Sequence, residues 1–376
     1  MNGAANKRFT TLDVFRGITV FLMIVVNTQG SGAVPYPQMM HADWHGCTLT
    51  DLVFPSFLFA VGNAMVFANK KFKALPAKTV WYKITKRTVL LFIIGFLLAW
   101  YPFIGWNGQG DVWWKPFAET RIMAVLQRIA LAYFFAAVII KYLSEKNILI
   151  ASVILLLLYW LLLYVFGDAG TPYTIEGNAV RKLDLLILGE QNMYKERGIT
   201  FDPEGLLSTI PSVVNVLAGY LAGAFLLREG TTYKGLAKLL TAGFLLLFAG
   251  ICWNQFFPLN KKLWTSSYVC YTTGIDVIFI SFLLYAIEFK QWKLGVYFFS
   301  VFGKNPLFIY VLSNLLGVLL ILYVSKDVIV IDWLNQHVFQ AIAPGPAGCL
   351  LFALFFTCIC WLTGWLMDKK KIYVRL

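Results

Sequence analysis

The sequence predicts an all-α, polytopic membrane protein, and three observations lead to this fold class. Of the 376 residues, 59% are hydrophobic and only 14% are charged, far from the composition of a soluble domain. Apolar runs of about 20 residues, the length of a membrane-spanning helix, recur along the chain. Lysines and arginines gather in alternate connections between these runs. We therefore expect a single membrane domain over residues 1–376.

Each long apolar run is expected to form one membrane-spanning helix. A further apolar run at residues 294–302 is too short to cross, so it is expected to be re-entrant or to lie in the membrane plane. No cleavable signal peptide is expected before the first span, because no small-residue cleavage site follows it. The ten expected spans are residues 11–28, 50–69, 87–104, 121–141, 147–166, 208–227, 236–256, 266–288, 305–325 and 347–367.

The distribution of basic residues predicts the orientation in the membrane. With both termini in the cytoplasm, the cytoplasmic segments hold 21 of the 32 lysines and arginines, the outer loops hold 8, and the spans or their ends hold 3. Basic connections stay on the cytoplasmic side. The net charge of +13 is therefore a topological signal that reflects attraction to membrane lipids, and it does not predict nucleic-acid binding.

This topology places all three histidines, His41, His45 and His337, in loops on the outer face. Residues 167–207 lie on the same side, and their polar composition with Gly and Pro predicts a structured extracytoplasmic cap. His337 is expected to be a surface residue. The six cysteines show no CxxC spacing and are expected to be packing residues.

The segment HADWHGCTLTDLVFPSFLFAVG, residues 41–62, is the strongest candidate for chemistry. It joins a histidine-bearing loop to an apolar helix with Asp51 in its first turn. Histidine gives or takes a proton near neutral pH. His41 and His45 have the spacing of a helical zinc site, but Trp44 and Gly46 interrupt the helix, so no metal is expected.

Charged side chains inside spans are costly and mark candidate functional positions. Arg16 lies in the first span, and Arg121 and Arg128 lie in the fourth. Seven residues apart, the latter two are expected on one helix face, as a ladder that grips phosphates. As alternatives, Arg16 and Arg121 would anchor lipid headgroups, and Arg128 would form a buried ion pair with an acid such as Asp51 or Asp276.

Six collinear blocks between about residues 9 and 315 resemble heparan-α-glucosaminide N-acetyltransferase and its bacterial homologues. The blocks are RFTTLDVFRGITVFLMIVVN, HADWHGCTLTDLVFPSFLFAVGNA, RIMAVLQRIALAYF, FDPEGLLSTIPSVVNVLAGYLAG, NKKLWTSSYV and GKNPLFIYV. The resemblance implies a transmembrane acetyltransferase that takes acetyl-CoA from the cytoplasm and acetylates the amine of a glucosamine-type sugar on the other side. It also implies a homodimer. For a bacterial homologue, the location is the inner (plasma) membrane, with the active-site loop facing the periplasm or exterior.

The resemblance assigns the catalytic role to His41, with Asn27 implicated in the same site. His41 would be a general base, or would carry the acetyl group before passing it to the amine. Asn27 would orient the imidazole or stabilise the oxyanion. Asp51 would fix the imidazole tautomer, or would only cap its helix. His45 stands where the same motif in the family's lysosomal enzyme has an asparagine, so the resemblance assigns no helping role to His45.

The remaining site predictions concern the two substrates. The three aromatic candidates, Trp44, Trp264 and Tyr268, lie near the expected outer ends of the spans. Trp and Tyr at the ends of spans are also typical of the aromatic belt at a membrane surface, which is the alternative for these three residues. The residues expected to bind acetyl-CoA are Arg16, Arg121, Gln127, Arg128, Lys304 and Asn305. The residues expected to bind the acceptor are Trp44, His45, Asp202, Glu204, Trp264 and Tyr268.

A secondary transporter of a sugar or anionic solute is the alternative function. It would also need about ten spans and intramembrane charges. Transporters are commonly built from two repeats with interrupted helices in matching positions, and the two halves of this sequence show no such pair.

Overall fold

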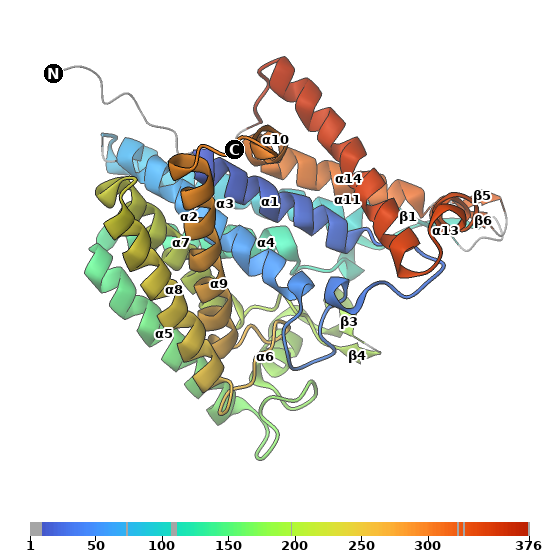
Figure 1. Ribbon diagram of the computed structural model, residues 1–376. Helices are drawn as coiled ribbons and strands as arrows, with labels where there is room; N and C mark the ends of the chain where they lie inside the picture. The colour runs from blue at the N-terminus through green and yellow to red at the C-terminus, as the bar shows by residue number, and fades with distance from the viewer. Residues whose placement is uncertain are drawn as a thin grey trace.

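A computed structural model describes residues 10–72, 74–106, 111–196, 198–321, 323–325 and 328–374. The predicted all-α, polytopic fold is confirmed, since long helices make up most of the chain and the strands among the described residues form three short hairpins (Figure 1). The long helices are α1 (Thr10–Asn27), α2 (Leu49–Phe72), α3 (Ala77–Trp100), α4 (Val125–Tyr142), α5 (Glu145–Phe166), α7 (Thr209–Glu229), α8 (Tyr233–Trp253), α9 (Ser266–Leu284), α11 (Pro306–Leu320) and α14 (Pro346–Lys369).

Short elements fill the connections. The helical ones are η1 (Pro37–Met39), η2 (Phe117–Glu119), α6 (Ala179–Leu188), η3 (Glu190–Asn192), η4 (Tyr285–Phe289), α10 (Val296–Lys304), α12 (Val330–Leu334), η5 (Asn335–Phe339) and α13 (Gln340–Ile342). The antiparallel hairpins are β1 (Ile104–Trp106) with β2 (Val112–Trp114), β3 (Lys195–Glu196) with β4 (Ile199–Thr200), and β5 (Tyr323–Ser325) with β6 (Val328–Ile329).

Within the described residues, eight helices are long and apolar enough to cross a membrane, or nine if the pair α10 and α11 is one span. That pair is bent by 84°, the geometry of a broken span or a re-entrant loop, as expected around residues 294–302. The expected span that is missing from this number is residues 87–104. It corresponds to α3, whose first half carries Lys78, Lys83, Lys86 and Arg87. The number of ten spans therefore stays a prediction.

Close helix packing holds α2, which carries Asp51, rigidly in the bundle. A Cβ added at Gly62 of α2 would lie 1.9 Å from the carbonyl oxygen of Val216 on α7. A Cβ at Gly219 of α7 would lie 2.0 Å from the carbonyl oxygen of Phe59 on α2. The two backbones therefore touch, as small residues allow in membrane helix pairs. The middle of α2 is therefore held closely against α7.

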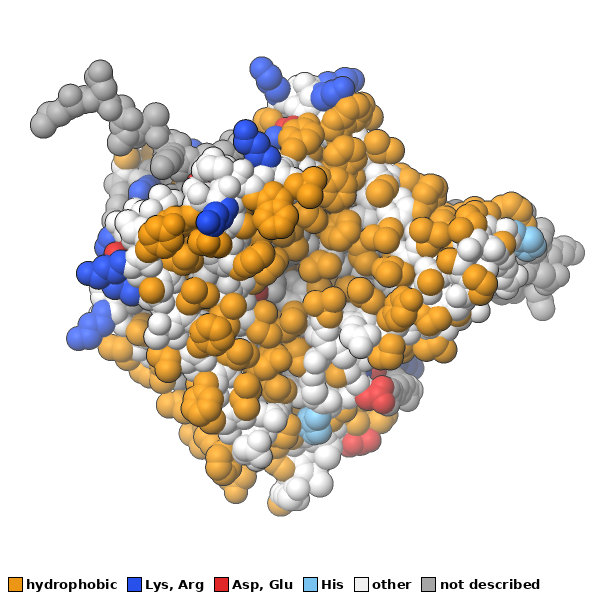
Figure 2. Space-filling model, in the orientation of Figure 1, with side chains coloured by type: hydrophobic (Ala, Val, Ile, Leu, Met, Phe, Trp, Pro, Cys, Tyr) orange, Lys and Arg blue, Asp and Glu red, His pale blue; other side chains and the backbone are white. Residues whose placement is uncertain are grey.

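The bundle has two different ends. The described parts of the connections at residues 28–48, 101–124, 167–208 and 254–265 meet at one end, which we call the histidine end because it holds His41. The opposite end, which we call the basic end, contains the start of α1 and the end of α14, both at the upper side of Figure 1, whereas α6, β3 and β4 lie at the lower side. Figure 2 shows lysine and arginine side chains along the upper and left edges, with a broad hydrophobic surface between the ends.

Candidate active site

His41 and Asp51 form a hydrogen-bonded pair at the histidine end. Asp51 is the third residue of α2, and its Oδ1 lies 2.6 Å from Nδ1 of His41. The side chain of Asp51 is only 1% exposed, whereas that of His41 is 42% exposed. A carboxylate at Nδ1 favours the tautomer with the proton on that nitrogen. Nε2 of His41 is then the nitrogen able to accept a proton from a substrate.

The second carboxylate oxygen of Asp51 accepts hydrogen bonds from the histidine loop and from the residue that precedes α2. It accepts hydrogen bonds from the backbone N–H of Ala42 at 3.1 Å, and from the backbone N–H and hydroxyl of Thr48 at 2.9 and 3.0 Å. The bond back to Thr48 N–H is one half of a capping box. The sequence left two alternative roles for Asp51, and the structure shows the contacts of both. Asp51 caps α2 and holds the imidazole of His41.

Two segments distant in sequence hold the histidine loop. The N–H of Gly46 donates to the carbonyl of Leu259 at 2.8 Å. The ammonium of Lys262 donates to the carbonyl of Asp43 at 2.8 Å and to Oε1 of Glu196 at 2.9 Å. The indole N–H of Trp44 donates to the carbonyl of Tyr173 at 2.8 Å. Loop 254–265 and the cap therefore clamp the loop from two sides.

Lys262 is a site residue that the sequence did not reveal. It is 8% exposed, and its partners are a backbone carbonyl and Glu196 of β3. Every residue offers a carbonyl, so no spacing or residue type in the sequence marks this contact. Nearby, Nδ1 of His45 lies 3.4 Å from the amide nitrogen of Asn260, and burial lowers the pKa of His45.

A buried ion cluster joins the start of α4 to the cap. Arg121 donates to both carboxylate oxygens of Asp202, at 3.0 and 2.7 Å, and to Glu204 at 2.6 Å. Lys261 lies 3.6 Å from the other oxygen of Glu204. Although burial opposes ionisation, these cations lower the pKa of Glu204 to about 2, and the two acids raise the pKa of Arg121. Arg121, Asp202 and Glu204 are thus already paired with one another.

The predicted arginine ladder is wrong. Helix α4 begins at Val125, and Arg121 lies in the extended segment before it, so Arg121 and Arg128 do not share a helix face. Arg128 is fully buried and donates to the carbonyl of Gly205 at 2.9 Å and to the hydroxyl of Ser208. The alternative ion pair with Asp51 or Asp276 is also wrong, because Asp51 bonds to His41 and Asp276 accepts from Ser56.

Trp264 and Tyr268 lie behind the site and not on its surface. Both are 0% exposed. The Trp264 ring lies 5.0 Å from the Arg128 guanidinium, and its N–H donates to Asn215 at 2.9 Å. The Tyr268 hydroxyl donates to the backbone carbonyl of Asp51. This arrangement excludes the predicted stacking on a sugar and the alternative of a membrane-surface belt, and it makes the two rings a support for α2.

Asn27 makes no hydrogen bond to the His41–Asp51 pair among the described residues. It ends α1 and lines a cavity of about 220 Å³ together with Gln29, Ser313 and Asn314. Gln127 is fully buried against Gly95 of α3, and neither amide atom has a hydrogen-bond partner within the described structure.

The remaining predicted cofactor residues lie at the basic end. Arg16 pairs with Asp13 at 2.5 Å, and Lys304 pairs with Asp368 at 2.7 Å. Asn305 bonds to the chain after α14, through the carbonyl of Ile372 at 3.0 Å and the N–H of Val374 at 2.9 Å. The six predicted cofactor residues are therefore divided between two ends of the bundle, and the structure does not bring them together.

The fold and the site together define a class: multi-span, all-α membrane proteins with a histidine–aspartate pair at one end of the bundle. Residues 8–251 match the family model described as "Heparan-alpha-glucosaminide N-acetyltransferase, catalytic", and the chain belongs to this family. The resemblance that the six sequence blocks indicated is thereby confirmed.

Two curated relatives agree with this assignment. The heparan-alpha-glucosaminide N-acetyltransferase of Homo sapiens is 29% identical over 368 residues, covering 82% of this chain and 53% of the relative. The mouse (Mus musculus) protein of the same name is 28% identical over 365 residues, covering 81% of this chain and 53% of the relative. The chain thus spans about half the length of the curated relatives it matches.

Proposed function

We propose that this protein is an integral membrane acetyltransferase that moves an acetyl group from acetyl-CoA to the amine of a glucosamine-type sugar. The observation that carries the proposal is the His41–Asp51 pair, since an exposed imidazole held by a buried carboxylate at 2.6 Å is the geometry of a general base. The pair lies in the part of the chain that matches the family's catalytic domain. The proposed acceptor class is taken from the names of the two relatives, which are heparan-alpha-glucosaminide N-acetyltransferases.

In direct transfer, the amine nitrogen attacks the thioester carbonyl carbon and its proton passes to Nε2 of His41. The C–S bond then breaks, and the proton returns to the leaving thiolate. In the two-step alternative, Nε2 attacks the thioester carbonyl carbon, the C–S bond breaks and the thiolate leaves. The amine then attacks the acetyl-imidazole, the bond between the acetyl carbon and Nε2 breaks, and the amine proton passes to the thiolate. Asp51 stabilises the charged imidazole in both routes. Incubation with labelled acetyl-CoA and no acceptor separates the two routes. Label that becomes bound to the wild-type protein but not to His41→Ala would support the two-step route.

We further propose that the histidine end faces the periplasm or exterior of a bacterial inner (plasma) membrane, and that the donor arrives from the cytoplasm. The gathering of lysine and arginine at the opposite end supports this orientation (Figure 2). Trp44 and His45, which lie beside His41, are proposed to contact the acceptor. Asn27 is proposed to act once substrate is bound. The homodimer expected from the family stays a prediction.

Arg121, Asp202 and Glu204 stay proposals as substrate contacts, but a substrate would have to compete with their mutual ion pairs. The same holds for Arg16 and Lys304 as donor contacts. Gln127 and Asn305 are also proposed to bind the donor. The amide atoms of Gln127 have no hydrogen-bond partner among the described residues, whereas those of Asn305 are hydrogen-bonded to the backbone after α14.

The test is transfer of labelled acetyl from acetyl-CoA to glucosamine or a glucosamine-ended oligosaccharide by purified protein in detergent. We expect His41→Ala to lower kcat by about 10²- to 10⁴-fold, the usual contribution of general acid–base catalysis. Asp51→Asn keeps the helix cap and is expected to lower kcat by about 10²-fold or more, since it removes the charge that stabilises imidazolium.

His337→Ala is the matched control, because His337 is exposed and stacks on Trp333 at the surface. It should leave the rate unchanged. Full turnover in a folded His41→Ala protein would overturn the proposed mechanism. Accumulation of unmodified sugar inside proteoliposomes, without acetylation, would instead support the transporter.

A further inference from the structure

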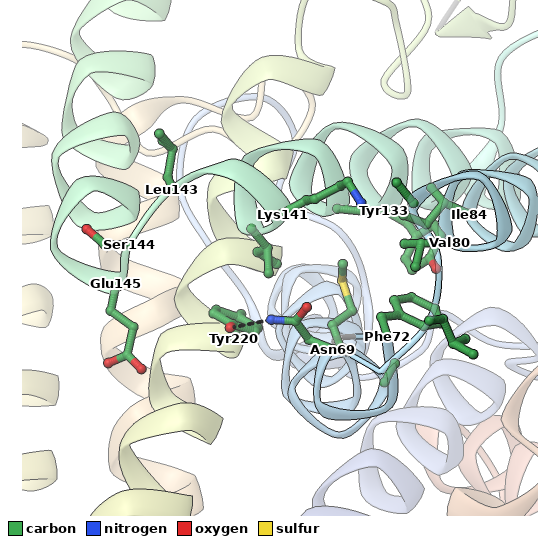
Figure 3. Close-up of a pocket in the computed structure, with 16 residues that line it drawn as sticks. Asn69, Phe72, Val80, Ile84, Tyr133, Lys141, Leu143, Ser144, Glu145 and Tyr220 are labelled. Carbon is green, nitrogen blue, oxygen red and sulfur yellow. Dashed lines mark hydrogen bonds between the residues drawn. The ribbon is translucent and has the colours of Figure 1, made fainter.

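A cavity of about 510 Å³ opens at the basic end, far from His41 (Figure 3). Its walls come from α2, α3, α4, α7 and the start of α5. Its volume lies within the range of small-molecule sites, about 300 to 1,000 Å³. None of the residues predicted to bind either substrate lines it.

The walls combine aromatic rings with a carboxamide. Phe72, Tyr133 and Tyr220 line the cavity, and Asn69 lies between Phe72 and Tyr220 in Figure 3. The amide nitrogen of Asn69 donates to the Tyr220 hydroxyl at 3.0 Å, which leaves its carbonyl oxygen able to accept another hydrogen bond. Rings and a carboxamide suit a flat ligand group with polar edges.

Lys141, which lines the cavity, and Arg87, which contacts the wall residue Tyr133 without lining the cavity itself, have no carboxylate partner among the described residues. Lys141 lines the cavity, and its ammonium has only the ring of Trp81 beside it, at 5.6 Å. The Arg87 guanidinium lies 4.6 Å from the ring of Tyr133, a wall residue, and its Nε is buried without a hydrogen-bond partner. Glu145 also lines the cavity but is paired with Arg228 at 2.6 Å.

We infer that this cavity binds a phosphate-bearing ligand with a flat ring group, and that its occupant is the nucleotide end of the acyl donor. Unpaired cations beside a cavity favour an anion from solution, and arginine with lysine is the usual pair for phosphates. The identity of the donor rests on the proposed function, but the existence of the anion site does not. An anionic phospholipid headgroup offers the same phosphate and is the competing source.

The position of the cavity requires an elongated ligand. Asn69 and Asp51 are 18 residues apart on α2, which corresponds to roughly 27 Å along the helix axis. A donor that binds its phosphates in the cavity and presents its thioester at His41 must therefore carry a long arm. A compact anion such as inorganic phosphate would bind in the cavity without reaching the site.

The experiment is calorimetric titration of the purified full-length protein with CoA and with adenosine 3′,5′-bisphosphate. Lys141→Gln and Arg87→Gln should each weaken both ligands by about 10-fold or more, the usual loss for one charge-assisted hydrogen bond. Lys83→Gln is the matched control, since Lys83 is an exposed cation one turn before Arg87 on α3, and it should leave both affinities unchanged.

The outcomes separate this inference from the proposed function. His41→Ala should lower kcat as stated above and leave CoA affinity unchanged. CoA binding that depends on Lys141 in a protein without transferase activity would retain the site and reject the function. Transferase activity with an unchanged KM for acetyl-CoA in both Lys141→Gln and Arg87→Gln would reject the site and retain the function. An anionic phospholipid that co-purifies with the wild type but not with Lys141→Gln, with CoA affinity unchanged, would overturn the nucleotide assignment.

Discussion

The ion cluster of the histidine end and the cavity of the basic end treat charge in opposite ways. At the histidine end, Arg121, Glu204 and Lys262 each have a protein partner of opposite charge, and the His41 imidazole is held by a carboxylate. At the cavity of the basic end, Lys141 and Arg87 have only aromatic rings as partners among the described residues. Paired charges fix geometry before substrate arrives, whereas unpaired cations leave binding energy for a ligand.

The sharpest way to break this comparison is to remove one cation from each end. Arg121→Gln leaves Asp202 and Glu204 facing each other in a buried site, so it should lower the free energy of unfolding by about 3 to 5 kcal/mol. Lys141→Gln should change it by less than about 0.5 kcal/mol, as for substitutions away from packed or paired sites. Thermal unfolding of both proteins without ligand measures the difference, and equal losses would contradict the comparison.

A second test concerns the clamp on the histidine loop. Lys262→Met keeps the apolar stem but removes the contacts to Asp43 and Glu196, and it should lower kcat about 10-fold because misplacing the imidazole slows transfer. Lys262→Arg should restore part of kcat, and KM for acetyl-CoA should not move in either variant. A matched control is Lys182→Met, which breaks an exposed pair with Asp168 in the same cap.

The smallest expected effect is a pH dependence of the cap. Burial raises the pKa of Asp184 on α6 to about 7, so between about pH 4 and 7 the folded protein holds a proton that the unfolded chain has released. Stability from this group is therefore present at low pH and is lost as pH rises through about 7. Asp184→Asn should flatten the melting temperature between about pH 5 and 8, by a few °C.

The control for that prediction is Asp168→Asn, which removes an exposed cap carboxylate paired with Lys182. It should leave the pH profile of the wild type intact. A profile that stays steep in Asp184→Asn would show that another group couples the cap to pH.

Much of the fold followed from the sequence because the length of an apolar run fixes a membrane helix almost by itself. The error at Arg121 shows the limit: the run RIMAVLQR reads as helix throughout, but the N–H of Ile122 bonds to the carbonyl of Asn192 in the cap, which keeps the chain extended up to Ala124. That partner lies 70 residues away, and no local signal indicates it.

The candidate site was predictable where it is local in sequence. His41 and Asp51 are ten residues apart and lie on the two sides of one helix start, so their contact follows from the loop between them. Trp264 and Tyr268 were misplaced because an aromatic residue near a span end reads the same whether it faces lipid or the core. Burial of these rings depends on Arg128, Asn215 and Asp51, which belong to three other helices.

The bonds from Gly46 to Leu259 and from Lys262 to Asp43 cross from the first half of the chain to the second. The matched catalytic region ends at residue 251, before both partners in loop 254–265. A chimera that exchanged residues 8–251 between two relatives would therefore take His41 and Asp51 from one protein and loop 254–265, which holds the histidine loop, from the other. For chimeras within this family, we expect the smallest segment that can be exchanged without loss of activity to extend through residue 265. His41 and the loop 254–265 that holds it in place are then transferred together.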